Sequence, residues 1–347
     1  MEEKLKRAVV LGGSGFVGRR MVEMLASEPH PSWPVFDEIV SADIAPFEGP
    51  LPDRVRSRWC DVRSKDSLRA TLDGAHTVFH LASVVHVGLS KSPHIEAVNV
   101  DGTRNVIDVC RALGVPHLVY TSSEDVVLDR EPVADGDESI PYPAEPIHDY
   151  VRTKIQAEKL ALAAHGADLA VCAVRPTHVY GPHDPHAIPE SLRQFAQGTM
   201  PMVIGDPSAR FDCVYVDNVV HAHVLAAARL HDPATRDAVG GRAYFVSEGY
   251  APNFFDFLVP FAEAKGLRVP QRRLPKRVAF ALADLFALAH RATGFEPPFH
   301  RFHLYVIGQD FFFNAKRAER ELGYAPIVST KQGIERTLEW VRDLDLR

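Results

Sequence analysis

The feature that most constrains the fold is a set of spaced glycines near the beginning of the chain. Four apolar residues, 8–11, lead into Gly12, Gly15 and Gly18, and a helical pattern follows. Gly12 permits a tight turn, Gly15 lets the backbone approach a pyrophosphate, and Gly18 lets the helix pack against the strand. An ordinary glycine-rich turn is the alternative. The context predicts a strand, a phosphate-binding turn and a helix.

A carboxylate at the end of the next apolar segment supports this interpretation. Asp43 ends residues 38–43 and follows Gly18 by 25 positions, where a carboxylate can accept hydrogen bonds from the ribose hydroxyls of an adenine dinucleotide. No Arg or Lys occurs between Asp43 and Arg54, so the pattern favours NAD over NADP. Asp61, at the end of the third predicted strand and beside Val62, is a candidate for the adenine edge. A role at the start of the next helix is its alternative.

Short β-branched segments alternate with helical segments through the first half of the chain. This pattern predicts an α/β fold, a Rossmann-type doubly wound parallel sheet with its function at the carboxyl ends of the strands. We expect residues 1–176 to form the cofactor-binding core and residues 177–347 mainly a smaller substrate-binding region, with some segments returning to the core. The predicted strands are 7–12, 38–43, 55–61, 77–82, 118–123, 169–175 and 311–313, and the predicted helices are 15–27, 65–72, 95–113 and 149–165.

A tyrosine and a lysine four residues apart are the first candidates for chemistry. Tyr150 and Lys154 fall in a helical segment and therefore share one face. This spacing alone is common and usually reflects an exposed pair. Here it follows the glycine turn and a strand that ends at Ser122 and Ser123. The combination predicts a phenol, an ammonium group and a hydroxyl around one ligand.

Together these motifs resemble the extended short-chain dehydrogenases/reductases over nearly the whole chain. Further matches are an Asn-Val-x-Gly-Thr segment at 99–103 and an Arg-Pro-x-x-x-Tyr-Gly-Pro segment at 175–182. The resemblance implies that Tyr150 exchanges the proton of a secondary alcohol or ketone while hydride moves to or from NAD. Lys154 would hold the nicotinamide ribose and favour the phenolate, and Ser123 would bind the substrate oxygen.

The resemblance also implies a wider set of site residues. Asn99 is a candidate for a proton relay or for positioning, with a buried amide that bridges helix and sheet as its alternative. The implied cofactor contacts are Gly12, Gly15, Phe16, Val17, Gly18, Asp43, Asp61, Val62, Leu81, Ala82, Ser83, Tyr150, Lys154 and Pro176.

Three segments bear on the substrate. His178 stands where sugar-nucleotide epimerases carry an Asn that contacts phosphate. Residues 211–223 closely resemble the 3β-hydroxysteroid dehydrogenase branch, including the sterol-4-carboxylate 3-dehydrogenases. Residues 123–126 instead resemble the Thr-Asp-Glu-Val of sugar-nucleotide dehydratases with the two acids exchanged. On balance, these segments favour a lipophilic substrate.

We therefore expect an NAD-dependent dehydrogenase that acts on a bulky secondary alcohol, the 3β-hydroxyl of a sterol or steroid. A 4-carboxysterol would give a β-keto acid that loses carbon dioxide without a further catalytic residue. The alternatives are a sugar-nucleotide epimerase or dehydratase, a long-chain 3-keto acid reductase, and an inactive nucleotide sensor or scaffold.

The remaining sequence features concern partners and location. Lys plus Arg (39) minus Asp plus Glu (45) gives −6, so nucleic acid is not expected. The first apolar run is too short for a signal peptide and the cysteines show no paired spacing, so we expect a cytoplasmic protein. Basic residues 272–277 precede an apolar helical segment at 278–289, which indicates either peripheral membrane contact or a core or lid helix. We predict no metal site, and the resemblance implies a homodimer through the helices after strands four and five.

Overall fold

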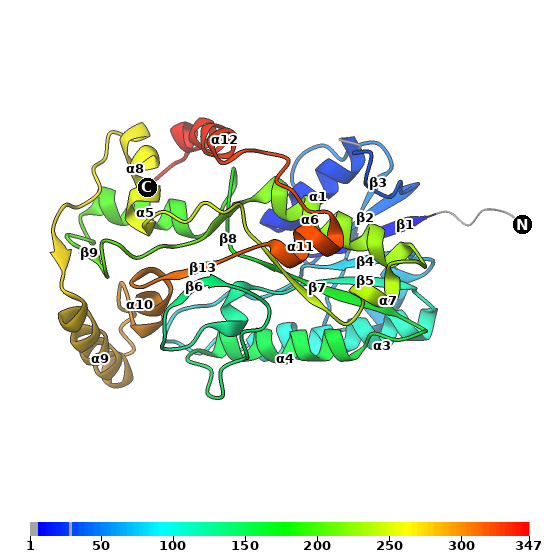
Figure 1. Ribbon diagram of the computed structural model, residues 1–347, viewed down its shortest axis with the longest axis horizontal. Helices are drawn as coiled ribbons and strands as arrows, with labels where there is room; N and C mark the ends of the chain where they lie inside the picture. Colours follow the sequence, from blue (N-terminus) through cyan, green and yellow to red (C-terminus); the bar gives the residue numbers. More distant parts are fainter. Residues whose placement is uncertain (1–5, 28–29, 347) are drawn as a thin grey trace, which may run out of the picture.

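The core of the protein is one sheet of seven parallel strands (Figure 1). In chain order these strands are β1 (Arg7–Leu11), β2 (Glu38–Asp43), β3 (Val55–Trp59), β4 (Thr77–His80), β5 (His117–Thr121), β7 (Ala170–Pro176) and β11 (Ala243–Val246). The spatial order β11-β7-β5-β4-β1-β2-β3 changes direction between β1 and β4. Doubly wound sheets bind ligands at such a point, beyond the carboxyl ends of the strands. The predicted fold class is confirmed.

The computed structural model describes residues 6–27 and 30–346. Residues 1–5 and 28–29, which belong to the predicted cofactor-binding core, and residue 347 therefore lie outside the described part of the chain.

Helices cover both faces of the sheet, and its central strands are buried on both sides. All residues of β4 and β7 are buried, as expected inside a parallel sheet. Each face packs with its helices into one hydrophobic cluster. The helices are α1 (Phe16–Ser27), α6 (Val216–His231) and α11 (Lys316–Leu322) on one face, and α2 (Lys65–Leu72), α3 (Thr103–Leu113) and α4 (Asp149–Ala163) on the other.

Two elements of the core differ from the sequence-based prediction. The predicted helix 95–113 begins as a π-helical segment, η1 (Ala97–Gly102), and continues as α3. Hydrophobic periodicity does not reveal such a local irregularity. The strand β11 is not predicted, because it follows the weakening of the strand–helix alternation after residue 176. It pairs with β7 and completes the sheet.

Most segments after residue 176 lie beyond the carboxyl ends of the sheet strands, on the left of Figure 1. A third hydrophobic cluster holds much of this region together. Three small parallel sheets pair β8 (His178–Tyr180) with β10 (Cys213–Tyr215), β9 (Val203–Ile204) with β12 (Arg273–Leu274), and β6 (Val133–Gly136) with the buried β13 (Phe311–Phe313). The other helices are η2 (Glu124–Val127), α5 (Ala187–Gln197), α7 (Arg236–Val239), α8 (Phe254–Ala264), α9 (Lys276–Thr293), α10 (Arg301–Ile307) and α12 (Thr330–Asp343).

The apolar segment 278–289 lies in α9, and its large side chains divide between a face that packs on the protein and a face that is exposed. Ala279 and Ala283 are buried, whereas Val278, Leu285 and Leu288 are 45%, 57% and 62% exposed. The alanines pack against the protein together with the partly buried Phe280 and Leu282, so α9 is a surface helix with one apolar face exposed. None of the helices in the described residues is sufficiently long and apolar to span a membrane.

Candidate active site

The glycine turn between β1 and α1 has the shape of a phosphate site. Gly12 has a φ of +85°, and a Cβ there would lie 2.7 Å from the Ala82 backbone nitrogen. A Cβ at Gly18 would overlap the Gly12 carbonyl, so α1 packs directly on the turn. At Gly15 a Cβ would meet, among the described residues, only the Gly12 carbonyl oxygen at 3.4 Å. The turn is thus closed toward the protein and open at Gly15. This open side lies beside the amino end of α1, which begins with Phe16 and Val17.

Asp43 lies next to this turn. Its carboxylate ends β2 and accepts hydrogen bonds from the backbone nitrogens of Ser14 and Ala45, both at 3.0 Å. The Ser14 hydroxyl donates to the Ala45 carbonyl at 3.0 Å and ties the two segments together. The carboxylate predicted to bind the ribose is therefore attached to the loop predicted to bind the phosphates.

Asp61 and Val62 lie beyond the carboxyl end of β3. The Arg63 guanidinium donates to both oxygens of Asp61 at 2.6–3.0 Å, and these hydrogen bonds lower the pKa of Asp61. Asp61 does not cap α2, because Ser64 is the N-cap residue. Val62 is buried, and a Cβ at Gly102 would lie 2.7 Å from its methyl group.

Residues 81–83 lead from β4 past the glycine turn. The Leu81 nitrogen donates to the Leu11 carbonyl at 2.9 Å, and Ala82 forms the wall that excludes a side chain at Gly12. Pro176 lies at the end of β7, opposite Val246 of β11. These predicted cofactor contacts therefore lie at or just beyond the carboxyl ends of neighbouring strands.

Asn99 lies in η1 and is buried. Its Oδ1 accepts hydrogen bonds from the Val84 nitrogen at 2.8 Å and the Ser83 hydroxyl at 3.3 Å. Its Nδ2 donates to the Val84 carbonyl and to the Thr153 hydroxyl, both at 3.1 Å. These four bonds occupy the whole amide, so the geometry favours positioning of α4 over proton relay.

Ser123, Tyr150 and Lys154 are buried near one another at the end of β5. Ser123 caps η2, and Tyr150 lies in the first turn of α4. The Lys154 ammonium donates to the Thr121 carbonyl at 2.7 Å and lies over the Tyr120 ring. Burial lowers the pKa of Lys154 to about 8. Burial and the nearby acids raise the pKa of Tyr150, although a hydrogen bond with Ser123 opposes this.

Two buried carboxyl groups accompany Ser123. Its hydroxyl lies 3.3 Å from Glu124 Oε2 and 3.2 Å from Asp125 Oδ2. Burial, with the neighbouring Asp125 charge as a second cause, raises the pKa of Glu124, and burial raises the pKa of Asp125 to about 6. Two close carboxylates disfavour simultaneous ionisation, so the pair can hold a proton near neutral pH.

The same face of α4 carries a third ionic group that sequence reasoning missed. Glu158 follows Lys154 by one helical turn and forms a bidentate ion pair with Arg175, with distances of 2.6 and 2.9 Å. The Tyr142 hydroxyl donates to Glu158 at 2.6 Å. Glu158 is 0% exposed and Arg175 is 4% exposed, so the pair is fully internal. The i, i+4 spacing from Lys154 is a signal that could have found Glu158.

A second contact that sequence reasoning missed fixes Thr121, the residue whose carbonyl accepts a hydrogen bond from Lys154. His223 Nδ1 lies 2.8 Å from the Val219 carbonyl, which can only accept, so this nitrogen carries the proton. His223 Nε2 then accepts a hydrogen bond from the Thr121 hydroxyl at 2.7 Å. Burial lowers the pKa of His223 to about 4 and keeps this arrangement neutral.

Residues 211–223, which carry the sequence resemblance, are mainly structural. Asn218 is buried and accepts from the Ile327 and Val328 nitrogens at 2.8 and 2.9 Å, which fixes the closing segment of the chain to α6. Asp217 is buried and pairs with the Arg20 guanidinium. This segment stabilises the fold in which the site is built.

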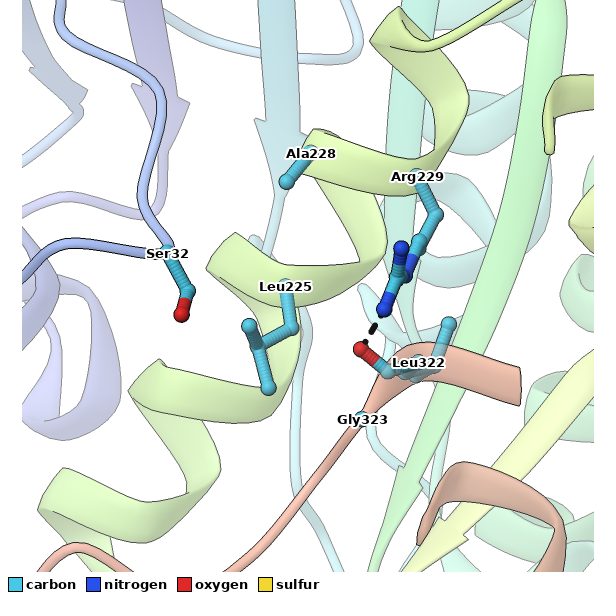
Figure 2. A pocket seen from close by; sticks show the side chains of 6 residues that line it. All are labelled: Ser32, Leu225, Ala228, Arg229, Leu322 and Gly323. Atoms are coloured by element: carbon cyan, nitrogen blue, oxygen red, sulfur yellow. Dashed lines mark hydrogen bonds between the residues drawn. The ribbon is translucent and has the colours of Figure 1, made fainter. Parts of the chain in front are cut away.

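A depression of about 250 Å³ lies between α6, Ser32 and the end of α11 (Figure 2). Arg229 crosses it and donates to the Leu322 carbonyl at 3.2 Å. None of the predicted site residues lines it. It is therefore separate from the candidate active site.

Comparison with known proteins gives a consistent result. A sterol-4-alpha-carboxylate 3-dehydrogenase (decarboxylating) of Saccharomyces cerevisiae is 34% identical, with 97% of this chain and 98% of that protein covered. A 3 beta-hydroxysteroid dehydrogenase/Delta 5-->4-isomerase of Mycobacterium tuberculosis is 32% identical, with 97% and 90% covered. The solved structure of MoeE5 in complex with UDP-glucuronic acid and NAD is 26% identical, covers 97% of this chain and 99% of that chain, and has a TM-score of 0.70.

The doubly wound sheet, the glycine turn after its first strand, and Tyr and Lys one turn apart on α4 define the class of extended short-chain dehydrogenases/reductases. Within this class, the model of the 3-beta hydroxysteroid dehydrogenase/isomerase family matches residues 9–276. The chain belongs to that family.

Proposed function

We propose that this protein is an NAD-dependent dehydrogenase that oxidises the 3β-hydroxyl group of a sterol or steroid. The observation that carries the proposal is the placement of Ser123, Tyr150 and Lys154 together at the carboxyl edge of the sheet in a member of this family. The names of two relatives, a sterol-4-alpha-carboxylate 3-dehydrogenase and a 3 beta-hydroxysteroid dehydrogenase/Delta 5-->4-isomerase, support this class of substrate.

The residues at the ends of β1 and β2 fit NAD. The open side of Gly15 and the amino end of α1 would hold the pyrophosphate, and Asp43 would accept hydrogen bonds from the adenosine ribose. A 2′-phosphate would be repelled by the same carboxylate. When bound, NAD supplies a hydride acceptor and a positively charged ring beside Tyr150.

The side chains of the site then bind the substrate oxygen and remove the proton of the substrate hydroxyl group. Ser123 donates a hydrogen bond to the substrate oxygen, and Tyr150 takes the hydroxyl proton as the alcohol carbon loses hydride. The pKa of Tyr150 is raised by burial and acidic neighbours in the protein alone. Phenolate formation therefore depends on positive charge, which Lys154 and the bound cofactor provide. Asp125, with a pKa of about 6, can receive the proton through Ser123.

The test is NADH formation by purified protein with NAD and a panel of alcohols. The panel contains a 3β-hydroxysterol, its 3α epimer, a 4-carboxysterol, a long-chain β-hydroxy acid, UDP-glucose and dTDP-glucose. NADH formation with the 3β but not the 3α alcohol is expected. Carbon dioxide release with the 4-carboxysterol would identify the decarboxylating reaction, and turnover of the β-hydroxy acid alone would overturn the sterol assignment.

A sugar-nucleotide epimerase or dehydratase is the second candidate. The observation that favours it is the acidic pair Glu124 and Asp125 beside Ser123, since elimination from a sugar needs an acid and a base in addition to Tyr150. We expect no product from UDP-glucose or dTDP-glucose in the same panel, which would exclude the epimerase or dehydratase function. Conversion of either nucleotide without net NADH would establish it.

We also propose that α9 lies on an anionic membrane surface. Its exposed face carries Val278, Leu285 and Leu288, and the basic residues Lys276 and Arg277 at its start are exposed. An apolar helical face with flanking cations is the pattern of interfacial helices. A lipophilic substrate could then enter from the bilayer.

The α9–α10 segment is connected to the candidate active site. The Glu296 carboxylate accepts hydrogen bonds from the Leu89 and Ser90 nitrogens at 3.1 and 2.6 Å. His148, the N-cap residue of α4, contacts the Gly88 carbonyl at 3.0 Å through Nε2. The loop at 88–90 therefore joins the proposed membrane face to the helix that carries Tyr150.

Vesicle sedimentation tests the membrane contact. Wild-type protein is expected to bind vesicles that contain phosphatidylserine, and a Leu285→Ser/Leu288→Ser variant is expected to lose binding. Val35→Ser is the matched control, because Val35 is 71% exposed and lies outside α9, in the segment that precedes β2. Equal binding by the double variant and the control would refute the role of α9.

The homodimer implied by the resemblance is proposed to form through α3 and α4, which pack side by side on one face of the sheet. Light scattering coupled to size exclusion should then give twice the chain mass of 38.5 kDa. Gln156→Arg/Lys159→Glu, at exposed positions of α4, should give a monomer.

A further inference from the structure

Three histidine side chains meet at the end of the sheet opposite the candidate active site. His76 directly precedes β4, His117 begins β5, and His231 ends α6. The ring centroids lie 4.8 Å apart for His76 and His117, 4.6 Å for His76 and His231, and 4.3 Å for His117 and His231. One nitrogen atom from each ring lies within 4.8 Å of the other two.

Each ring is also held by an oxygen atom of the protein. Thr77 Oγ1 lies 3.0 Å from His76 Nδ1 and 2.8 Å from His231 Nε2. The His76 carbonyl lies 3.3 Å from His117 Nδ1. Each imidazole therefore has one nitrogen engaged by an oxygen and keeps a second nitrogen. Histidine ligands of metal ions are typically oriented in this way by an outer oxygen partner.

We propose that His76, His117 and His231 form a binding site for a divalent cation of the Zn²⁺ type, with water as the fourth ligand. Three imidazoles and water are a common tetrahedral set for zinc. Zn–N bonds of about 2.0–2.1 Å place neighbouring ligand atoms about 3.3 Å apart, so the ring nitrogens must approach one another by at most about 1.5 Å on binding. His76 and His231 are only partly buried, which gives an ion access from solvent.

The environment keeps the three rings in the form that a metal requires. Burial lowers the pKa of His117 to about 4 and the pKa of His231 to about 3, and it also lowers the pKa of His76. The rings oppose protonation of one another, and Lys6 and Arg236 add to this effect. At neutral pH all three imidazoles are therefore uncharged, and no imidazolium proton must be displaced when an ion binds.

The site is distinct from the machinery of hydride transfer. His117 and Thr121 are the first and last residues of β5, which separates them by about 13 Å at about 3.3 Å per residue. Thr121 is the residue that holds Lys154. A bound ion would join β4, β5 and α6 at their far ends, so we assign it a stabilising role. The sequence analysis predicts no metal site. It could not reveal this one, because positions 76, 117 and 231 are too far apart in the chain to form a recognisable metal-binding motif.

The experiment uses the full chain, stripped of metal with a chelator and titrated with Zn²⁺ alone. Calorimetry is expected to show one saturable site per chain with a dissociation constant of micromolar or below. Saturating Zn²⁺ should raise the melting temperature by a few degrees, since ligands of the folded state stabilise it. Co²⁺ should give the visible absorption of a tetrahedral nitrogen site.

Two variants and a control decide the assignment. His76→Gln changes a partly buried loop residue, and His117→Gln changes a strand residue. Each should weaken Zn²⁺ binding by at least about tenfold, the lower limit of the loss seen when even an outer partner is removed. His94→Gln, at an exposed histidine, should bind as the wild type does. Circular dichroism and NAD affinity report whether each variant is folded.

Two results would overturn the proposal. One is the absence of saturable Zn²⁺ binding by the wild-type chain. The other is equal affinity in His76→Gln, His117→Gln and His94→Gln, which would place the ion elsewhere. Neither result bears on the proposed dehydrogenase activity.

Discussion

Replacement of Glu158 by Gln tests how the internal ion pair supports the helix that carries Tyr150 and Lys154. The substitution preserves shape but removes the charge that Arg175 faces at 2.6 Å. Arg175 would remain buried, and its Nη1 already has no hydrogen-bond partner among the described residues. A buried charge that loses its partner typically destabilises a protein by about 3–5 kcal/mol. At about 2.1 cal/mol/K per residue, the melting temperature of this 347-residue chain should fall by about 4–7 °C.

The matched control is the ion pair between Lys65 and Asp108. Its distance is 2.7 Å, but its side chains are 44% and 45% exposed. Asp108→Asn should therefore cost at most about 1 kcal/mol. The double variant Glu158→Leu/Arg175→Met removes both charges and should recover much of the stability lost by Glu158→Gln.

The pH dependence gives a second check on Glu158. Burial opposes ionisation, but Arg175 outweighs it and lowers the pKa of Glu158 below its ordinary 4.5. The stabilisation should therefore be complete above pH 4.5 and decline as the pH falls through the lowered pKa. Calorimetric melting of both single variants from pH 3 to pH 8 measures this difference. If Glu158→Gln melted within 1 °C of Asp108→Asn at pH 7, the reasoning would be refuted.

Three further predictions concern the candidate active site. Tyr150→Phe should reduce kcat by about 10²–10⁴-fold while fluorescence titration shows unchanged NAD affinity, and unchanged turnover would remove Tyr150 from the mechanism. Asp43→Ala should weaken NAD binding by about tenfold or more and reduce the ratio of NAD affinity to NADP affinity. A wild-type preference for NADP would contradict the binding of the adenosine ribose by Asp43. Because burial lowers the pKa of Lys154 to about 8, kcat/KM should decline as the pH rises above 8, and Lys154→Arg should lose this limb. A wild-type kcat/KM that rises steadily up to pH 10 would exclude the required positive charge on Lys154.

The local sequence was sufficient to predict most strands and helices of the core, because these elements follow simple rules of burial and periodicity. The predicted helix 65–72 has the same bounds as α2, and the predicted strand 38–43 has the same bounds as β2. Asp43 could be placed beside the glycine turn because both follow adjacent parallel strands. Tyr150 and Lys154 could be paired because i, i+4 residues share a helix face.

The features that escaped prediction depend on contacts between distant segments. The sequence left Asn99 open between a proton relay and a buried bridging amide, and its amide is fully occupied because η1, the loop after β4 and α4 meet there. Glu158 is internal because Arg175 and Tyr142 come from other segments. Which apolar side of α9 is exposed depends on which side finds a partner, and here Ala279, Ala283 and Phe280 face the protein.

The position of β11 at the edge of the sheet affects how the chain can fold during synthesis. β7 is buried along its whole length, and residues 243–246 of β11 cover its outer edge. A ribosome that has released only the first 176 residues would present β7 as an uncovered apolar edge, which favours aggregation. The nascent nucleotide-binding half must therefore wait for about 70 more residues, or about 4–14 s of translation at 5–20 residues per second. A chain truncated after residue 176 should accordingly require a chaperone to stay in solution.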